Sequence, residues 1–220
     1  MPSQKNTLSN LVPLLLLTLL LTSCSSAYYS AMEKVGVHKR DILVDRVEEA
    51  RDAQQDAQEE FKSALEQFAS VVALRETDLK VAYDKLNAEY LDCKEVSKEV
   101  SDQINKVEKV SEDLFEEWEE ELDLYENRTY QANSKRQLRE TKSRYQDMLF
   151  SMSAAEQSMA PVLQTFEDNV LYLKHNLNAQ AIGSLQGQFA GLQKDIDMLI
   201  ERMNKAIQES NAFIAQMGQH

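Results

Sequence analysis

The 220-residue chain carries 37 acidic and 24 basic side chains, a formal net charge of −13. Proteins bind nucleic acid through clustered Lys and Arg, so this balance argues against a nucleic-acid partner. Glycine and proline are scarce, with five and three residues. This composition predicts long uninterrupted helices, in one domain or an elongated pair.

An apolar run at the N-terminus, from Leu11 to Leu21, is interrupted only by Pro13 and Thr18. It is too short for a membrane-spanning helix, which needs about 20 residues. Lys5 precedes the run without any acidic residue, and small polar residues follow it. This three-part layout is typical of a secretory leader, although a buried helix is the alternative. We therefore expect residues 1–23 to be a signal peptide.

The end of this leader, Leu21-Thr22-Ser23-Cys24, resembles the lipobox of bacterial lipoproteins. The resemblance implies cleavage between Ser23 and Cys24 and acylation of Cys24, palmitate included. Three acyl tails exceed the two membrane signals needed for stable anchoring. By the same resemblance, Ser25 favours the outer membrane, with the protein facing the periplasm. Loss of Lys5 with the leader would leave 23 basic and 37 acidic side chains, a formal charge of −14.

The remaining chain divides into a predicted tether, residues 24–40, and a predicted helical domain, residues 41–217. From Asp41 to about Arg75, apolar residues recur at steps of three and four, which is the seam spacing of a coiled coil. Thr77 or Asp78 could cap the next helix. A second stripe runs from Leu79 to Tyr125, a rod of about 70 Å at 1.5 Å per residue.

Cys93 lies on the apolar face of this second helix. If Cys24 is acylated, no intrachain disulfide is possible. We interpret Cys93 as a small core residue, with a reactive or intermolecular thiol as the alternative.

The end of the second helix holds nine acidic residues and no basic one between Ser111 and Asn127. Acid at a helix C-terminus opposes the macrodipole, and pairs such as Glu116/Glu120 repel each other. The next segment is basic, and carries Arg128, Lys135, Arg136, Arg139, Lys142 and Arg144. A turn at residues 127–133 would fold this basic helix back against the acidic one. A solvated acidic face is the alternative; a calcium site fits poorly, because helical spacing does not converge six to eight oxygens on one ion.

The basic segment begins a third helix, in which Pro161 predicts either a restart or a kink. Another break is expected near residues 176–178. The last helix shows regular heptads from Ile182 to Met217.

Three glycines, Gly183, Gly187 and Gly191, follow each other at intervals of four residues in this last helix. Each costs about 1 kcal/mol of helix propensity relative to alanine. Close packing against a neighbouring helix is the favoured explanation, and a groove for a partner is the alternative. These glycines, together with Glu116, Glu117 and Glu120, are the candidate partner surfaces.

Catalytic motifs are not found. None of the three histidines forms the Glu-x-x-His pair of di-metal helix bundles, and they are too scattered for a zinc site. The sequence has no phosphate-binding loop and no G-x-S-x-G elbow. We expect no catalytic residue, metal or cofactor, and therefore a protein that is not an enzyme.

Three segments carry a family resemblance: MEKVGVHKRDILVDRVEEARDAQ (32–54), SALEQF (63–68) and VLYLKHNLNAQAIGSLQ (170–186). They resemble a family of Gram-negative, mainly gammaproteobacterial, lipoproteins classed only as a domain of unknown function. The resemblance covers nearly the whole mature chain and implies a mostly helical envelope protein without an assigned catalytic residue.

The expected fold is an all-α, elongated antiparallel bundle of coiled-coil hairpins with three to five long helices. The favoured function is that of a lipid-anchored periplasmic structural or adaptor protein which binds a protein partner. A homo-oligomeric coiled coil and a membrane-remodelling helical protein are the alternatives.

Overall fold

The computed structural model describes residues 38–73, 79–176 and 179–218. The chain divides into two compact units, Met1–Ile42 and Leu43–His220. The elements are α3 (Lys39–Ala73), α4 (Leu79–Glu121), the short 3₁₀ helix η1 (Leu122–Leu124), α5 (Arg128–His175) and α6 (Ala179–Met217). The described residues contain four long helices and no strand, which confirms the all-α prediction.

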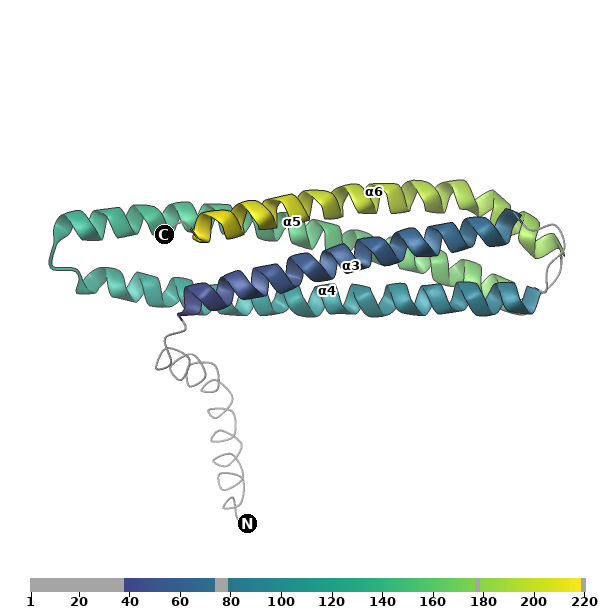
Figure 1. The fold of residues 1–220 in the computed structure, drawn as a ribbon, viewed down its shortest axis with the longest axis horizontal. Coiled ribbons are helices and arrows are strands. Elements are labelled where there is room, and N and C mark those ends of the chain that lie inside the picture. Colours follow the sequence, from purple (N-terminus) through teal and green to yellow (C-terminus); the bar gives the residue numbers. More distant parts are fainter. Residues whose placement is uncertain (1–37, 74–78, 177–178, 219–220) are drawn as a thin grey trace, which may run out of the picture. The chain divides into compact units, whose positions relative to one another are not determined.

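The four long helices of the second unit lie alongside one another, and successive helices run in opposite directions (Figure 1). Side-chain hydrogen bonds give the register of α3 against α6. Arg51 donates to Asn211 at 3.1 Å, and Gln58 donates to Asn204 at 2.9 Å. The residue number rises in one helix as it falls in the other, so α3 and α6 are antiparallel.

The core is formed by the apolar stripes that the heptad spacing predicts. Phe68 of α3 contacts Phe166 of α5 and Phe189 of α6, with ring centroids 5.9 and 6.0 Å apart. Phe166 also meets Tyr90 of α4 edge to face at 6.3 Å. One aromatic cluster therefore joins all four helices, and side chains at seam spacing continue the core on both sides of it.

Two glutamines of α3 extend polar side chains into this core. Gln54 is fully buried and donates to the backbone carbonyl of Met152 at 3.2 Å. Gln58 donates to the carbonyl of Ile200 and to Asn204. A buried amide N–H is costly without an acceptor, so these bonds disfavour shifted pairings of α3 against α5 and α6.

The helix bounds agree with the sequence-based expectations at most ends. The first helix and the start of the second lie where predicted, and α5 ends at His175, next to the expected break. There the backbone N–H of Asn176 donates to the carbonyl of Leu173. Thr77 and Asp78, the candidate caps of α4, fall outside the described residues.

Of the two alternatives predicted at Pro161, a restart and a kink, the restart is wrong, because α5 continues through this residue. Proline removes one backbone hydrogen bond, but its neighbours Met159 and Val162 are almost fully buried and Pro161 itself is exposed. Burial on both sides of the proline keeps the chain helical at a position where propensity alone disfavours it.

Candidate functional site

The turn between α4 and α5 is a compact hairpin apex. α4 ends at Glu121, η1 covers Leu122–Leu124, and α5 begins at Arg128. The turn therefore lies at residues 122–127, and the predicted range of 127–133 is wrong, because residues 128–133 belong to the first turns of α5. Asn127 explains the difference, because its side chain accepts hydrogen bonds from the backbone N–H groups of Thr129 and Tyr130 at 2.9 and 3.3 Å. This N-cap starts α5 directly after the turn.

The α4–α5 hairpin extends beyond the end of α6 (Figure 1). Tyr145 of α5 contacts Phe213 of α6, with ring centroids 6.3 Å apart. From this level α6 continues only to Met217, about 6 Å further, whereas α5 continues to Arg128, about 25 Å away at 1.5 Å per residue. The last part of α4 and the first part of α5 therefore form a two-helix extension of the bundle.

Specific side-chain contacts hold the two arms of the extension together. Trp118 donates from Nε1 to Ser134 Oγ at 2.8 Å, and Gln131 donates to the carbonyl of Leu122 at 2.9 Å. Near its base, Phe115 packs edge to face on Tyr145 at 5.3 Å. These contacts tie α4, η1 and α5 along the whole extension, so the apex is held by a defined structure.

Tyr145 is the titratable group most affected at the base of the hairpin. Burial is the main reason that the pKa of this phenol rises to about 12. The hydrogen bond from the Ser111 hydroxyl, 2.6 Å long, opposes the shift, while Glu108 and Glu112 add to it. Tyr145 is therefore a neutral, structural hydroxyl over the physiological range of pH.

The expected pairing of acidic and basic stretches occurs across the hairpin. Lys142 Nζ lies 2.6 Å from Glu119 Oε1 and 5.3 Å from the ring centroid of Phe115. Glu119 is more than half exposed, so this ion pair contributes at most about 1 kcal/mol. The hairpin topology is confirmed, and its stability comes mainly from the apolar and hydrogen-bonded contacts between the arms.

A groove of about 520 Å³ runs between the arms on one side of the hairpin. Glu119 and Asp123 line it from the acidic arm, and Lys135, Arg139 and Lys142 line it from the basic arm. Leu138, at its base, is almost fully buried. The groove therefore has an apolar floor between walls of opposite charge.

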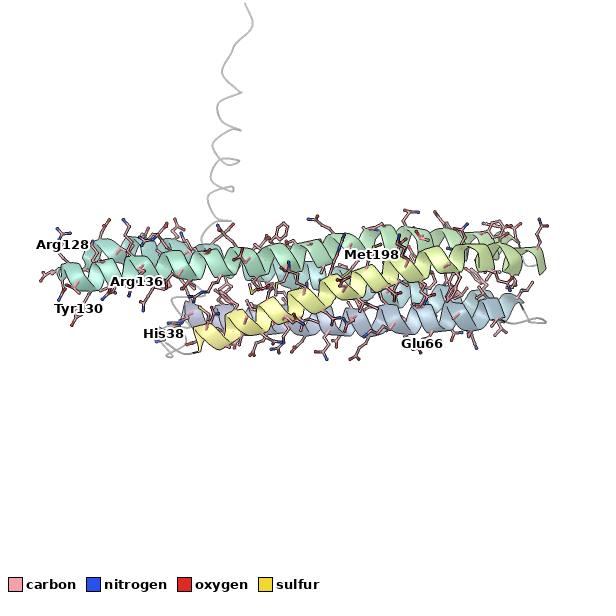
Figure 2. The ribbon with its side chains drawn as sticks, turned by 90° about the horizontal axis from the view of Figure 1, so that it is seen from above. His38, Glu66, Arg128, Tyr130, Arg136 and Met198 are labelled. Atoms are coloured by element: carbon pink, nitrogen blue, oxygen red, sulfur yellow. The ribbon has the colours of Figure 1, made fainter. Side chains whose placement is uncertain are left out.

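The apex itself exposes large apolar side chains. Leu124 is 79% exposed and Tyr130 is 63% exposed, and Tyr125 lies between them in the turn. Figure 2 shows Arg128 and Tyr130 together at the end of the hairpin, with Arg136 further along α5. Sequence reasoning missed this patch, although two tyrosines and a leucine flanking a polar turn were a visible signal.

The acidic candidates Glu116, Glu117 and Glu120 all lie in the hairpin. Glu116 and Glu120 are exposed, and Glu117 is half-buried. Their role as a partner surface stays a prediction. Ser23 and Cys24 lie outside the described residues.

The glycine candidates occupy a different place from the one expected. Gly183, Gly187 and Gly191 are exposed, and a Cβ atom added at any of them would meet no atom within 4 Å. An α-helix turns about 100° per residue, so Gly183 and Gly187 lie about 160° from Leu185, the buried seam residue between them. Close packing against a neighbouring helix is therefore wrong for these glycines, because they face outward. The partner groove stays a prediction.

Cys93 is a fully buried residue of α4, which confirms its interpretation as part of the core. Burial raises the pKa of its thiol, and the carboxylates of Glu60, Glu89 and Asp92 add to the shift. A neutral thiol without access to solvent is a poor nucleophile.

A second groove, of about 460 Å³, lies between α5 and α6. Asp168, Asn169 and Tyr172 line it from α5, and Ser184 and Gln188 line it from α6. Several of its polar groups are bonded within the protein: Asn169 donates to the carbonyl of Thr165, and the hydroxyls of Tyr172 and Ser184 are 3.4 Å apart. The second of these contacts joins α5 to α6, whereas the first lies within α5.

Neither metal ligands nor membrane spans are found in the described part of the chain. Across residues 38–73, 79–176 and 179–218, no group of three or more His, Cys, Asp or Glu side chains is arranged to hold a metal ion. In the same ranges no helix combines the length and apolar character required to cross a membrane.

These features define an all-α protein, an antiparallel bundle of long helices with a two-helix extension. The chain belongs to the family described as Protein of unknown function (DUF2959), whose model matches residues 28–217. This match confirms the resemblance to a family without an assigned function. Comparison with curated proteins and with solved structures gives no match.

Proposed function

We propose that this protein is a lipid-anchored helical adaptor of the bacterial cell envelope, which binds a protein partner through the apex of its α4–α5 hairpin. The observation that supports this role is the exposure of Leu124, Tyr125 and Tyr130 at the end of an extension whose two arms are joined by side-chain contacts. The role is one of binding, without catalysis.

The apex is suited to bind a protein. Tyrosine is enriched in protein interfaces because its ring provides apolar contact while its hydroxyl forms a hydrogen bond. Leu124 and Tyr130 could enter an apolar pocket of a partner, surrounded by the charged residues of the two arms. The Asn127 cap fixes the backbone at Thr129 and Tyr130, which reduces the backbone entropy lost on binding.

The proposed attachment rests on the N-terminal sequence pattern. Acylation at Cys24 would hold the N-terminus at the membrane, and Ser25 favours the outer membrane. Since two lipid signals suffice for stable anchoring, no spanning helix is needed.

Metabolic labelling with a palmitate analogue tests the anchor. The wild-type protein should carry the label and fractionate with the outer membrane. Cys24→Ala should lose the label and run as the larger, unprocessed precursor. A labelled Cys24→Ala variant, or an unlabelled wild type, would exclude lipidation at this residue.

Photocrosslinking in cells tests the apex. A photoreactive amino acid replaces Tyr130 at the apex, or Phe150, which is 71% exposed but lies in the middle of α5. We expect one discrete crosslinked protein from position 130, absent at position 150 and lost when Leu124→Ser is added. Equal crosslinking from both positions would show that the apex has no preferred partner.

A further inference from the structure

One side of the hairpin carries two rows of charged side chains that run along its length. The acidic strip lies on α4 and the basic strip lies on α5. Lys135, Arg139 and Lys142 lie within about 60° of one another around α5, because the helix turns 100° per residue. On α4, Glu112, Glu116 and Glu119 lie within a similar sector, and Asp123 continues their row along the groove. All of these side chains are exposed except Lys142, which is half-buried.

The parts of the two strips nearest the apex are accessible to a large partner. Arg139 and Lys135 lie about 9 and 15 Å beyond Tyr145 along α5, whereas α6 ends about 6 Å beyond the level of that residue. The groove between Asp123, Lys135 and Arg139 therefore lies beyond the end of α6.

A second copy of the chain has the complementary charge pattern by symmetry. Rotation by 180° about an axis parallel to α4 and α5 exchanges left and right, so each acidic strip meets the basic strip of the other copy. The exposed carboxylates of α4 in each copy then face the exposed cations of α5 in the other copy. This contact occurs twice, once on each side of the axis. A partner of uniform charge could match only one of the two strips and would be repelled by the other.

We propose that this charged side of the hairpin pairs with the same side of a second copy of the chain, and so forms a two-fold symmetric dimer. The two hairpins run in the same direction and place their apices next to each other. The dimer does not require the apex to bind a partner, so this inference goes beyond the adaptor function.

The interface is mostly electrostatic, which determines how it responds to salt. Exposed charges are screened over about 8 Å at physiological ionic strength and over about 3 Å at 1 M salt. We expect dimerisation of the full chain to weaken at least about tenfold between low and high salt, by analogy with other steered charged interfaces.

Charge reversal with mutual rescue tests the pairing. In the acidic-strip variant, Glu116→Lys is combined with Asp123→Lys; in the basic-strip variant, Lys135→Glu is combined with Arg139→Glu. These four residues are exposed, so the substitutions leave the core intact. Sedimentation equilibrium of the full chain in density-matched detergent gives the dimer dissociation constant of each variant and of their mixture.

Each variant alone should dimerise at least about tenfold more weakly than the wild type, because like strips then face each other. The mixture of the two variants should recover the wild-type dissociation constant. A control with the same change in net charge as the acidic-strip variant, Glu66→Lys with Glu201→Lys, alters exposed positions on α3 and α6 and should dimerise like the wild type (Figure 2 shows Glu66).

Three results would overturn the pairing: a monomeric wild type, undiminished dimerisation of either strip variant, or a mixture that does not recover. Thermal unfolding of each variant, followed by circular dichroism, identifies any loss of folding. Recovery of the wild-type dissociation constant in the mixture independently excludes misfolding as the cause of weaker dimerisation. A monomeric chain that still crosslinks a partner from position 130 would refute the dimer and leave the adaptor function standing.

Discussion

Phe166 is the side chain whose truncation tests the packing of the bundle most directly. It is fully buried in α5 and contacts the rings of Phe68 and Tyr90, so it joins α5 to α3 and α4. Phe166→Ala would leave a cavity at this junction. Truncation of a buried phenylalanine costs about 3–5 kcal/mol, and the loss of two aromatic contacts favours the upper half of that range.

This free-energy change is large enough to be measured by thermal unfolding. In a domain of about 150–250 residues, 1 kcal/mol corresponds to about 2–4 °C in Tm. Phe166→Ala should therefore lower Tm by roughly 8–20 °C, monitored by circular dichroism at 222 nm. Urea unfolding provides an independent value, provided that the slope of the transition is unchanged.

Phe150→Ala is the matched control, because it removes the same side chain from the same helix at an exposed position. It should change the free energy of unfolding by no more than about 0.5 kcal/mol. If the two variants melted at the same temperature, Phe166 could not lie in the four-helix core, and the packing of α3 and α4 against α5 would be refuted.

Three further predictions concern the helix α6, the hairpin cap and the buried thiol. Gly187→Ala should raise Tm by about 2–4 °C, since alanine is favoured in a helix by about 1 kcal/mol and its Cβ meets open space; a lower Tm would mean that this face is covered. Asn127→Ala should lower the stability of the first turn of α5 by about 1 kcal/mol and accelerate hydrogen exchange of the Thr129 and Tyr130 amides. Asn133→Ala, at an exposed position of the same helix, should leave the exchange of these amides unchanged. Because burial raises the pKa of Cys93, the folded chain keeps a proton that the unfolded thiol loses above about pH 8.5. The urea concentration at the midpoint of unfolding should therefore decrease as the pH is raised from about 8 to about 9.5. A Cys93→Ala variant with the same decrease would contradict this assignment.

The existence and approximate bounds of the helices could be predicted from the sequence. Apolar residues at steps of three and four form a continuous buried stripe only in a helix. The seams from Leu43 to Val72 and from Leu79 to Tyr125 therefore indicate which side of each helix faces its neighbours. Most of these residues lie in the core, but Leu79 is half-buried and Tyr125, at the end of the second seam, is exposed. The break after His175 could be predicted because the spacing of apolar residues is lost there. The reversal between α4 and α5 could be predicted because the acidic segment is followed directly by a basic one.

Local signals were insufficient where packing opposes them. Pro161 has a poor helix propensity, yet α5 passes through it because buried neighbours on both sides hold the backbone. For Gly183, Gly187 and Gly191, the residue type suggested close contact, but their angle to Leu185 places them on the outer face. That angle could have been calculated from the sequence. The prediction failed because it considered the residue type and not the side of the helix on which the glycines lie.

The extension and its groove depended on relative positions that no single helix specifies. The sequence by itself determined which side of each helix is apolar and that acidic and basic segments adjoin at a turn, because these properties follow from the order of residues along one helix. The level at which α6 ends beside α5, and hence the exposure of Leu124 and Tyr130, was decided only by tertiary contacts such as Tyr145 with Phe213. Such contacts join residues far apart in the chain, and their register depends on the packing of all four helices at once.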